Sequence, residues 1–475
     1  MQTESAVQIV ILGGTGDLAV RKLLPALYQL YIHKKLPSKF SILGSAKENF
    51  SHEAYQTFVA EAFSVYAHKH TKRKLAQFCK HLHYVGGDFS NNALYTSLTN
   101  ELAAYDNHIE AATNKLYYLA VPPSHYTAIL SKIKKHKLHL TCDKNTGWAR
   151  VLIEKPFGSD FRSAQKLDRK LGKLFKEEQI YRIDHYLAKE AVQNILSFRF
   201  SNTLMRGVWN KSNIERVEIA MHELLTVEGR GAFYDKIGAV RDVGQNHLLQ
   251  LVALLTMDEP KFFEPDHIRA ARAKALQCLK QQSANSIHDH FARAQYAGYK
   301  KAKGVADSST TETYFDLKLF SRHKDWRGVP IFITAGKALN EARVEVKVFF
   351  KDNAAGLFET ESCKVTENVV TLTISPRQAM HITLNAKLPG LRYQLQERTL
   401  SFDCPLGDKE ITNSYEKVLR DCIIGDQTLF ATTKEVLAQW RYINSILRSR
   451  HIVPLQTYRK GSRGPKHILR RANIE

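Results

Sequence analysis

The sequence lacks the features that mark secreted, membrane-spanning and zinc-binding proteins. Its six cysteines form no Cys-x-x-Cys pair and no close group with histidines, which argues against a disulfide framework and against a metal site. No apolar run approaches the roughly 18 residues that a membrane-spanning helix needs. The segment Met1–Ser5 lacks the basic start and the apolar stretch of a secretory signal. We therefore expect a cytoplasmic protein without a metal.

Acidic residues are too few to balance the basic ones. The chain has 69 Lys and Arg against 47 Asp and Glu, a net charge of +22, and such a charge attracts nucleic acids, acidic membranes or phosphorylated metabolites. The excess is concentrated in segments such as 441–475, which lack the interleaved aromatic residues that stack on bases. We interpret these segments as solvated faces, so nucleic-acid contact is not favoured.

The first part of the chain alternates strand and helix patterns. The apolar run Ala6–Leu12 breaks into a glycine turn, and apolar residues then recur at helical spacing. Further strand patterns occur at Phe40–Leu43, Leu116–Val121 and Val151–Ile153. This alternation predicts an α/β domain over residues 1–181, with a Rossmann-type, doubly wound parallel sheet.

The pattern changes after about residue 180. Helical patterns run through residues 187–198 and 239–256, and the alternating runs Arg343–Phe350 and Val369–Ile374 follow. They predict a larger α+β domain over residues 182–447 with a mainly antiparallel sheet. The basic segment 448–475 contains Pro and Gly residues and is expected to be a flexible tail.

The glycine turn after the first strand is a candidate phosphate site. Glycines between a strand and a helix let the backbone approach a pyrophosphate at the helix N-terminus. The spacing is Gly13-x-x-Gly16 rather than Gly-x-Gly-x-x-Gly, so a simple tight turn is the alternative. The candidate cofactor-binding residues are Gly13, Gly14, Thr15, Gly16, Asp17 and Leu18.

The tip of the second strand bears on the choice of cofactor. An acid there binds the ribose 2′-hydroxyl of NAD, whereas a cation accommodates the 2′-phosphate of NADP. The tip Gly44-Ser45-Ala46-Lys47 offers a hydroxyl and an ammonium and no acid. Ser45 and Lys47 therefore favour NADP, with NAD as a weaker alternative; a solvated loop lysine is the other interpretation of Lys47.

Three blocks occur in a fixed order: Gly13–Ala19, Glu154-Lys155-Pro156-Phe157-Gly158 and Arg182-Ile183-Asp184-His185-Tyr186-Leu187-Ala188-Lys189-Glu190. Together with Gln245-Asn246-His247 and Gly336-Lys337-Ala338-Leu339, they resemble the glucose-6-phosphate 1-dehydrogenase family over residues 6–447. The resemblance implies oxidation of glucose 6-phosphate at C1 with hydride transfer to NADP, the first step of the oxidative pentose phosphate pathway. It also implies a homodimer or homotetramer.

The resemblance assigns two catalytic residues. A histidine titrates near neutrality and suits a base for the C1 hydroxyl. Taken alone, His247 would be read as a core histidine on a helix, and Asp184 as a helix N-cap. The resemblance implies instead that His247 is the general base and that Asp184 orients it.

The resemblance also implies which residues bind the sugar and its phosphate. His185 and Lys189 are four residues apart, which would place them on one face of a helix, and the resemblance implies that they bind the 6-phosphate together with Tyr186. In the family, the residue that matches Lys155 contacts both sugar and cofactor. Three further residues match positions that bind the sugar in the family: Glu223, Asp242 and Lys337.

Several positions depart from the family pattern. Ala188 replaces a usual glycine, and Lys47 an arginine. Ile333-Thr334-Ala335 and Ser375-Pro376-Arg377-Gln378 also differ, which leaves sugar affinity and a second, structural NADP site open. Two alternatives remain: another two-domain sugar oxidoreductase of the glucose–fructose oxidoreductase-like type, and a noncatalytic NADP-sensing or nucleic-acid-binding relative.

Overall fold

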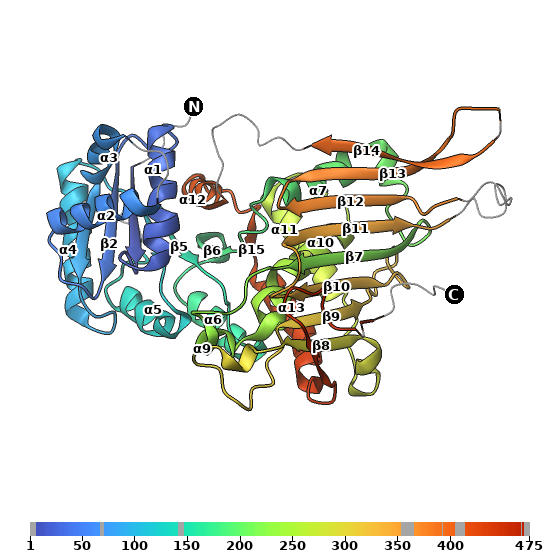
Figure 1. Ribbon diagram of the computed structural model, residues 1–475. Coiled ribbons are helices and arrows are strands. Elements are labelled where there is room, and N and C mark those ends of the chain that lie inside the picture. The colour runs from blue at the N-terminus through green and yellow to red at the C-terminus, as the bar shows by residue number, and fades with distance from the viewer. Residues whose placement is uncertain are drawn as a thin grey trace.

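A computed structural model shows two β-sheets that lie side by side (Figure 1). It describes residues 6–66, 71–140, 147–352, 365–391, 393–403, 414–466 and 468–469. The first sheet has seven strands in the order β15-β6-β5-β4-β1-β2-β3, and all neighbours are parallel except β15 and β6. The strands are β1 (Val7–Leu12), β2 (Phe40–Ala46), β3 (Leu82–Gly86), β4 (Asn114–Leu119), β5 (Ala149–Ile153), β6 (Ile180–Ile183) and β15 (Phe430–Ala431).

Helices enclose this sheet. Every residue of β1, β2 and β4 is buried, as expected of parallel strands with both faces covered. This confirms the predicted Rossmann-type sheet. The helices are α1 (Leu24–Ile32), α2 (His52–Tyr66), α3 (Lys72–Cys79), α4 (Asn92–His108), α5 (Tyr126–Lys135) and α6 (Phe161–Leu171).

The second strand is longer than its sequence pattern indicated. We expected it to end at Leu43, but β2 continues to Ala46. Gly44 has no side chain, and a Cβ there would lie 2.5 Å from the ring of Tyr55, so only glycine lets the strand continue beneath that ring. The tip of the strand therefore moves to Lys47 and the residue after it.

The second sheet has nine strands in the order β14-β13-β12-β11-β7-β10-β9-β8-β16. Only the pairs β10–β7 and β16–β8 are parallel, so the mainly antiparallel sheet is confirmed. The strands are β7 (Ile214–His222), β8 (Phe291–Tyr296), β9 (Tyr314–Leu319), β10 (Ile331–Gly336), β11 (Arg343–Phe350), β12 (Val369–Ser375), β13 (Ala379–Lys387), β14 (Leu395–Asp403) and β16 (Leu455–Tyr458).

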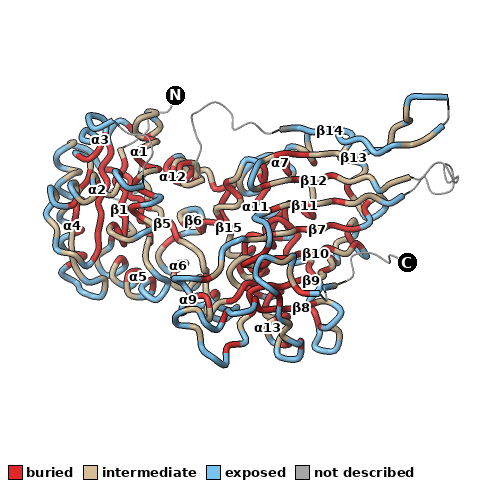
Figure 2. The backbone as a smooth tube through the Cα atoms, viewed as in Figure 1, coloured by how far each residue is buried: buried red, intermediate tan, exposed pale blue. Residues whose placement is uncertain are grey.

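Helices cover one face of this second sheet (Figure 1). The burial of β11 and β12 alternates along most of each strand, with Val346 and Val348 fully buried. Figure 2 shows the edge strand β14 largely exposed, whereas most residues of β13 are half-buried. No helix in the described ranges is long and apolar enough to cross a membrane. The helices are α7 (Glu190–Ser201), α8 (Thr203–Arg206), α9 (Gly231–Tyr234), α10 (Leu249–Thr256), α11 (Pro265–Gln277) and α13 (Thr433–Ser449), with a π-helical segment at Val240–Leu248.

The chain crosses between the two sheets more than once. Strand β6 spans the expected boundary at residues 181 and 182. After the second sheet, helix α12 (Ser414–Ile424) packs against α1, and β15 pairs with β6. The two domains are therefore joined through the sheet edge at β6.

The described residues of the expected flexible tail include the end of a helix and a strand. Residues 448 and 449 end α13, and β16 pairs in parallel with β8 at the edge of the second sheet. Tyr458 is buried although Arg459 and Lys460 beside it are exposed. The composition suggested a tail because it gives no sign of the partner strand, which lies about 160 residues earlier in the chain. The last six residues, 470–475, lie outside the described residues.

Candidate active site

The centre of the site is a buried contact between His247 and Asp184. Asp184 directly follows β6, and His247 lies in the π-helical segment that precedes α10. His247 Nδ1 is 2.5 Å from Asp184 Oδ1, and both side chains are almost fully buried. A carboxylate is acceptor-only, so Nδ1 carries the proton and Nε2 presents its lone pair. This is the tautomer that a general base needs.

Lys155 faces that lone pair. It follows β5, at the carboxyl edge of the first sheet, and its Nζ lies 2.7 Å from His247 Nε2. The same ammonium donates to the main-chain oxygen of Asp242 at 3.2 Å. The peptide bond between Lys155 and Pro156 is cis. Lys155 therefore bridges the base and the segment that carries Asp242.

The pKa shifts in this group agree with the tautomer. Burial lowers the pKa of His247; the Asp184 carboxylate opposes that effect and the Lys155 ammonium adds to it. Burial by itself would raise the pKa of Asp184, but His247 more than compensates and the pKa falls to about 2. Burial and the charges of His247 and Lys155 lower the pKa of His185 to about 3. At neutral pH Asp184 is ionised and both histidines are neutral.

The proposed phosphate residues lie together, but not on a helix. Residues 185–189 form consecutive turns and α7 begins at Glu190, so the helix expected here is wrong. Asp184 Oδ1 accepts the N–H of Tyr186 at 3.0 Å, which folds the chain into a turn. Lys189 Nζ lies 4.2 Å from the centre of the Tyr186 ring, and that ring stacks on His247 at 4.3 Å. Cation–π contact and stacking bring these side chains together.

Three further charged residues meet at the edge of the second sheet. Gly336 at the end of β10 is paired with His222 at the end of β7, and the two strands are parallel. Glu223 and Lys337 therefore follow their strands at the same edge and form an ion pair. Lys337 Nζ also lies 3.7 Å from Asp242 Oδ2. The structure thus brings the sugar-binding candidates beside the catalytic pair.

The glycine turn has the shape of a dinucleotide cradle. It follows β1 between β4 and β2, the point where the strand order reverses. Gly13 has a φ of 99°, and a Cβ there would lie 2.4 Å from the main-chain oxygen of Ala120. The N–H groups of Gly13 and Gly14 donate to the main-chain oxygen of Ser45 at 2.7 and 3.0 Å. These two glycines brace the turn against β2, so a pyrophosphate would meet Thr15 and the residues after it.

The residues at the tip of β2 differ from expectation. Ser45 is fully buried and its hydroxyl has no hydrogen-bond partner among the described residues, so its side chain does not reach the surface, whereas Lys47 is exposed. Glu48 follows Lys47, and its Oε2 accepts a hydrogen bond from Thr15 Oγ1 at 2.9 Å. We expected no acid at this tip. Glu48 was missed because the strand was taken to end three residues early.

Other expected positions have structural contacts. Asp17 is exposed and forms an ion pair with Arg21 at 3.3 Å. Thr334 donates to the buried Asp316 Oδ1 at 3.0 Å. The stretch at residues 375–378 differs from the family pattern. Its Gln378 Oε1 accepts the N–H of Ala191 at 2.7 Å, and this contact caps the first turn of α7 beside Lys189.

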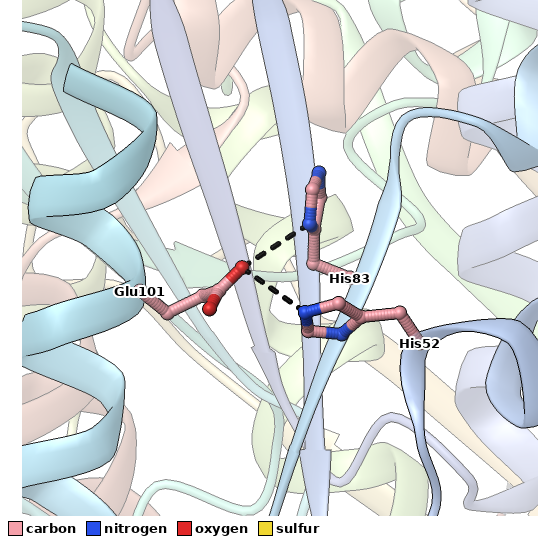
Figure 3. A group of neighbouring side chains, drawn as sticks. All are labelled: His52, His83 and Glu101. Carbon is pink, nitrogen blue, oxygen red and sulfur yellow. Dashed lines mark ion pairs between the residues drawn. The ribbon is translucent and has the colours of Figure 1, made fainter. Parts of the chain in front are cut away.

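The first domain carries a group of two histidines and a carboxylate at metal-ligand distances. His52, His83 and Glu101 point toward one another, with Glu101 Oε1 at 3.4 Å from His52 Nε2 and 3.2 Å from His83 Nδ1 (Figure 3). However, His52 Nδ1 accepts the N–H of Tyr84 at 3.0 Å, so Nε2 of the neutral ring carries the proton. A metal-ligating histidine normally donates its second nitrogen's proton instead. We assign no metal to this group.

Known proteins match the chain over almost its whole length. The family models for the glucose-6-phosphate dehydrogenase NAD binding domain and C-terminal domain match residues 10–194 and 196–473. The glucose-6-phosphate 1-dehydrogenase of Chlamydia pneumoniae is 35% identical, covering 96% of this chain and 93% of its own. Glucose-6-phosphate 1-dehydrogenase 6, cytoplasmic, of Arabidopsis thaliana is 35% identical, covering 97% and 89%.

The fold agrees with this match. A solved structure of glucose-6-phosphate dehydrogenase in complex with its substrate glucose-6-phosphate has a TM-score of 0.89 and 32% identity, covering 98% of this chain and 96% of that chain. The NAD binding domain match identifies the first sheet as a nicotinamide cofactor domain. The sequence resemblance is confirmed, and the chain belongs to the glucose-6-phosphate dehydrogenase family.

Proposed function

We propose that the chain is an NADP-dependent glucose-6-phosphate 1-dehydrogenase that oxidises D-glucose 6-phosphate at C1 to 6-phospho-D-glucono-1,5-lactone. The observation that carries the proposal is the buried series Asp184–His247–Lys155, in which the base is neutral and its free nitrogen faces a cation. In the family, this reaction opens the oxidative pentose phosphate pathway.

The proton of the C1 hydroxyl passes to His247. A hydroxyl that takes the place of the Lys155 ammonium at Nε2 would lie within hydrogen-bond reach of the base. Asp184 then stabilises the imidazolium and holds the ring through Nδ1. Lys155, displaced toward Asp242, remains next to C1 and favours loss of the hydroxyl proton because of its charge.

The other residues orient the sugar. Glu223 and Asp242 accept hydrogen bonds from sugar hydroxyls, and Lys337 between them donates. Lys189 supplies the charge that the 6-phosphate meets, with neutral His185 and Tyr186 as donors beside it. The phosphate contact holds C1 against His247, so binding energy from a remote group supports the reacting centre.

The cradle of Gly13 and Gly14 fits a dinucleotide, because side chains at these positions would collide with the backbone of the neighbouring strands. A dinucleotide held there would supply the nicotinamide as the acceptor for the hydride from C1. Residues 13–18 would hold the pyrophosphate, and Lys47 the 2′-phosphate of NADP. Glu48 suits a ribose 2′-hydroxyl and would allow NAD to bind as well, as the weaker alternative cofactor.

We further propose a cytoplasmic homodimer or homotetramer. The scattered cysteines fit a reducing compartment, and the oligomer is expected from the family. The glucose–fructose oxidoreductase-like and noncatalytic alternatives are not favoured, since the family models cover both domains and the candidate base, its aspartate and the phosphate lysine are all present.

The test is an initial-rate assay with glucose 6-phosphate and each cofactor, followed by reduced-cofactor absorbance. We expect turnover with both cofactors and a higher kcat/KM with NADP. Product analysis should identify the 6-phosphogluconolactone or its hydrolysis product. No turnover with either cofactor, in protein shown to bind NADPH, would contradict the proposal. Molecular mass from light scattering tests the oligomer.

A further inference from the structure

A cavity of about 370 Å³ lies between α5, α6 and the segment that follows α9. This volume is within the range of small-molecule sites. None of the residues assigned above to the sugar or the cofactor lines it. It nevertheless flanks them, because Pro156 follows Lys155 and Arg241 precedes Asp242.

Four basic side chains converge on this cavity. Lys166 and Lys170 come from one face of α6, Lys236 from the segment after α9, and Arg241 from the π-helical segment. Lys170 Nζ donates to Thr127 Oγ1 at 2.9 Å, and Arg241 donates to the main-chain oxygen of Ser159 at 3.2 Å. Within the described part of the chain, Lys166 and Lys236 have no hydrogen bond or ion pair, so both ammonium groups are available to a ligand.

No carboxylate lines the cavity. Among the acids that adjoin lining residues in the sequence, Asp160 is occupied at the start of α6, where its Oδ1 accepts the N–H of Ser163 at 2.7 Å. The hydroxyl of Ser159 adds a neutral group to the four cations, whereas Ser163 Oγ is engaged with Asp160 at the start of α6. Such a lining, with four cations and a hydroxyl and no carboxylate, is suited to a phosphate group.

Part of the lining is apolar. It includes Pro123, Pro156, Ile237, Leu167 and Trp440, and the Nε1–H of Trp440 donates to the main-chain oxygen of Phe157 at 2.9 Å. A ligand that fills the cavity therefore needs an uncharged part as well as a charged group. Inorganic phosphate would leave the apolar part uncovered.

We propose that this cavity is a second ligand site, separate from the catalytic cleft, for a small organic phosphate whose phosphate meets Lys166 and Lys236. Its uncharged part lies against Pro123, Pro156 and Ile237. Because Arg241 ties the loop after Lys155 to the segment before Asp242, a ligand in the cavity contacts both sides of the catalytic residues.

Calorimetric titration of the full chain with AMP tests the proposal. Saturating glucose 6-phosphate and NADPH are present together, a pair that cannot react in the forward direction and that fills both catalytic subsites. We expect AMP to bind under these conditions, and more tightly than inorganic phosphate. Lys166→Gln with Lys236→Gln should weaken AMP binding by about tenfold or more.

The matched control is Lys173→Gln with Lys300→Gln, two exposed lysines that do not line the cavity. It removes the same charge and should change AMP affinity by less than about twofold. An equal loss in both double variants would mean that only net charge matters. That result, absence of binding to the saturated protein, or equal affinity for AMP and inorganic phosphate would each overturn the proposal.

Discussion

Asp184 Oδ1 holds two groups at once: the Nδ1–H of His247 at 2.5 Å and the main-chain N–H of Tyr186 at 3.0 Å. One carboxylate oxygen therefore fixes both the tautomer of the base and the turn that carries the phosphate residues. Its second oxygen, Oδ2, is buried and has no hydrogen-bond partner among the described residues. The catalytic pair and the substrate turn are thus linked through a single side chain.

This link predicts different effects for the two catalytic residues. His247→Ala should lower kcat by a factor of about 10² to 10⁴, because only the proton transfer loses its base. Asp184→Asn should lower kcat to a similar degree and also raise KM for glucose 6-phosphate, since it disturbs the turn. NADPH binding, followed by fluorescence, should stay near wild type in both variants. A His247→Ala enzyme with a normal rate would remove His247 from the mechanism.

The pH profile should show which group is the base. The pKa of His247 is lowered, so the imidazole stays neutral at pH values below the ordinary histidine pKa of about 6.5. We expect kcat/KM to fall only as the pH drops below that value. Replacing Lys155 by Gln removes a cation that disfavours the imidazolium, so the pKa should rise and the acidic limb should move to higher pH.

Asp184→Asn should have the opposite effect on the profile, since the lost carboxylate favours the imidazolium; the limb should move to lower pH. Limbs that move in the same direction in the two variants would contradict the assignment of His247 as the titrating base.

Much of this site was predicted from sequence because its parts are local. A strand followed by Gly13-Gly14 indicates a phosphate turn. The two separate blocks that contain Asp184 and His247 each resemble a block of a known family. The parts that were missed depend on distant contacts. The helix expected at residues 185–189 is absent, and residues 184–186 instead form a turn in which Asp184 Oδ1 accepts the N–H of Tyr186. The spacing of His185 and Lys189 does not predict this turn. Strand β16 was missed because it forms only against β8.

The cofactor preference should depend on two adjacent residues with opposite charges. Lys47→Ala should raise KM for NADP about tenfold or more and change KM for NAD little, because only NADP carries the 2′-phosphate. Glu48→Gln should weaken NAD use and improve NADP use, since it removes a carboxylate that faces Thr15 across the turn. Initial rates with both cofactors decide this. Parallel changes in KM for NADP and NAD would exclude Lys47 as the discriminating residue.

The substrate phosphate should depend on Lys189. Glucose and glucose 6-phosphate share the reacting carbon, so a remote cation must distinguish them. Lys189→Ala should reduce kcat/KM for glucose 6-phosphate by about 10² or more and leave the slow oxidation of glucose nearly unchanged. Lys189→Arg keeps the charge over the Tyr186 ring and should recover much of the loss. Equal losses on both sugars would instead show that Lys189 supports the fold or the base.

The segment expected to be a flexible tail should affect sugar binding. Tyr458 at the end of β16 donates its hydroxyl proton to the main-chain oxygen of Lys337 at 2.6 Å, and Gly461 N–H donates to the oxygen of Ala338 at 2.8 Å. These bonds hold the loop that carries Lys337, which we propose as a sugar-binding residue. Tyr458→Phe keeps the buried ring and removes the first bond, together with the contacts of the hydroxyl to Thr313 Oγ1 at 3.0 Å and to the main-chain oxygen of Thr313 at 3.3 Å. It should lower the free energy of unfolding by about 1 kcal/mol and raise KM for glucose 6-phosphate several-fold, with little change in kcat.

Tyr299→Phe provides the matched control for this prediction. Tyr299 belongs to the same buried aromatic cluster, and its hydroxyl donates to Asp235 Oδ1 at 2.9 Å, away from the Lys337 loop. It should cost similar stability in urea unfolding and leave KM for glucose 6-phosphate unchanged. If both variants raised KM equally, a general loosening of the cluster would explain the effect. A KM change confined to Tyr458→Phe would show that β16 positions Lys337.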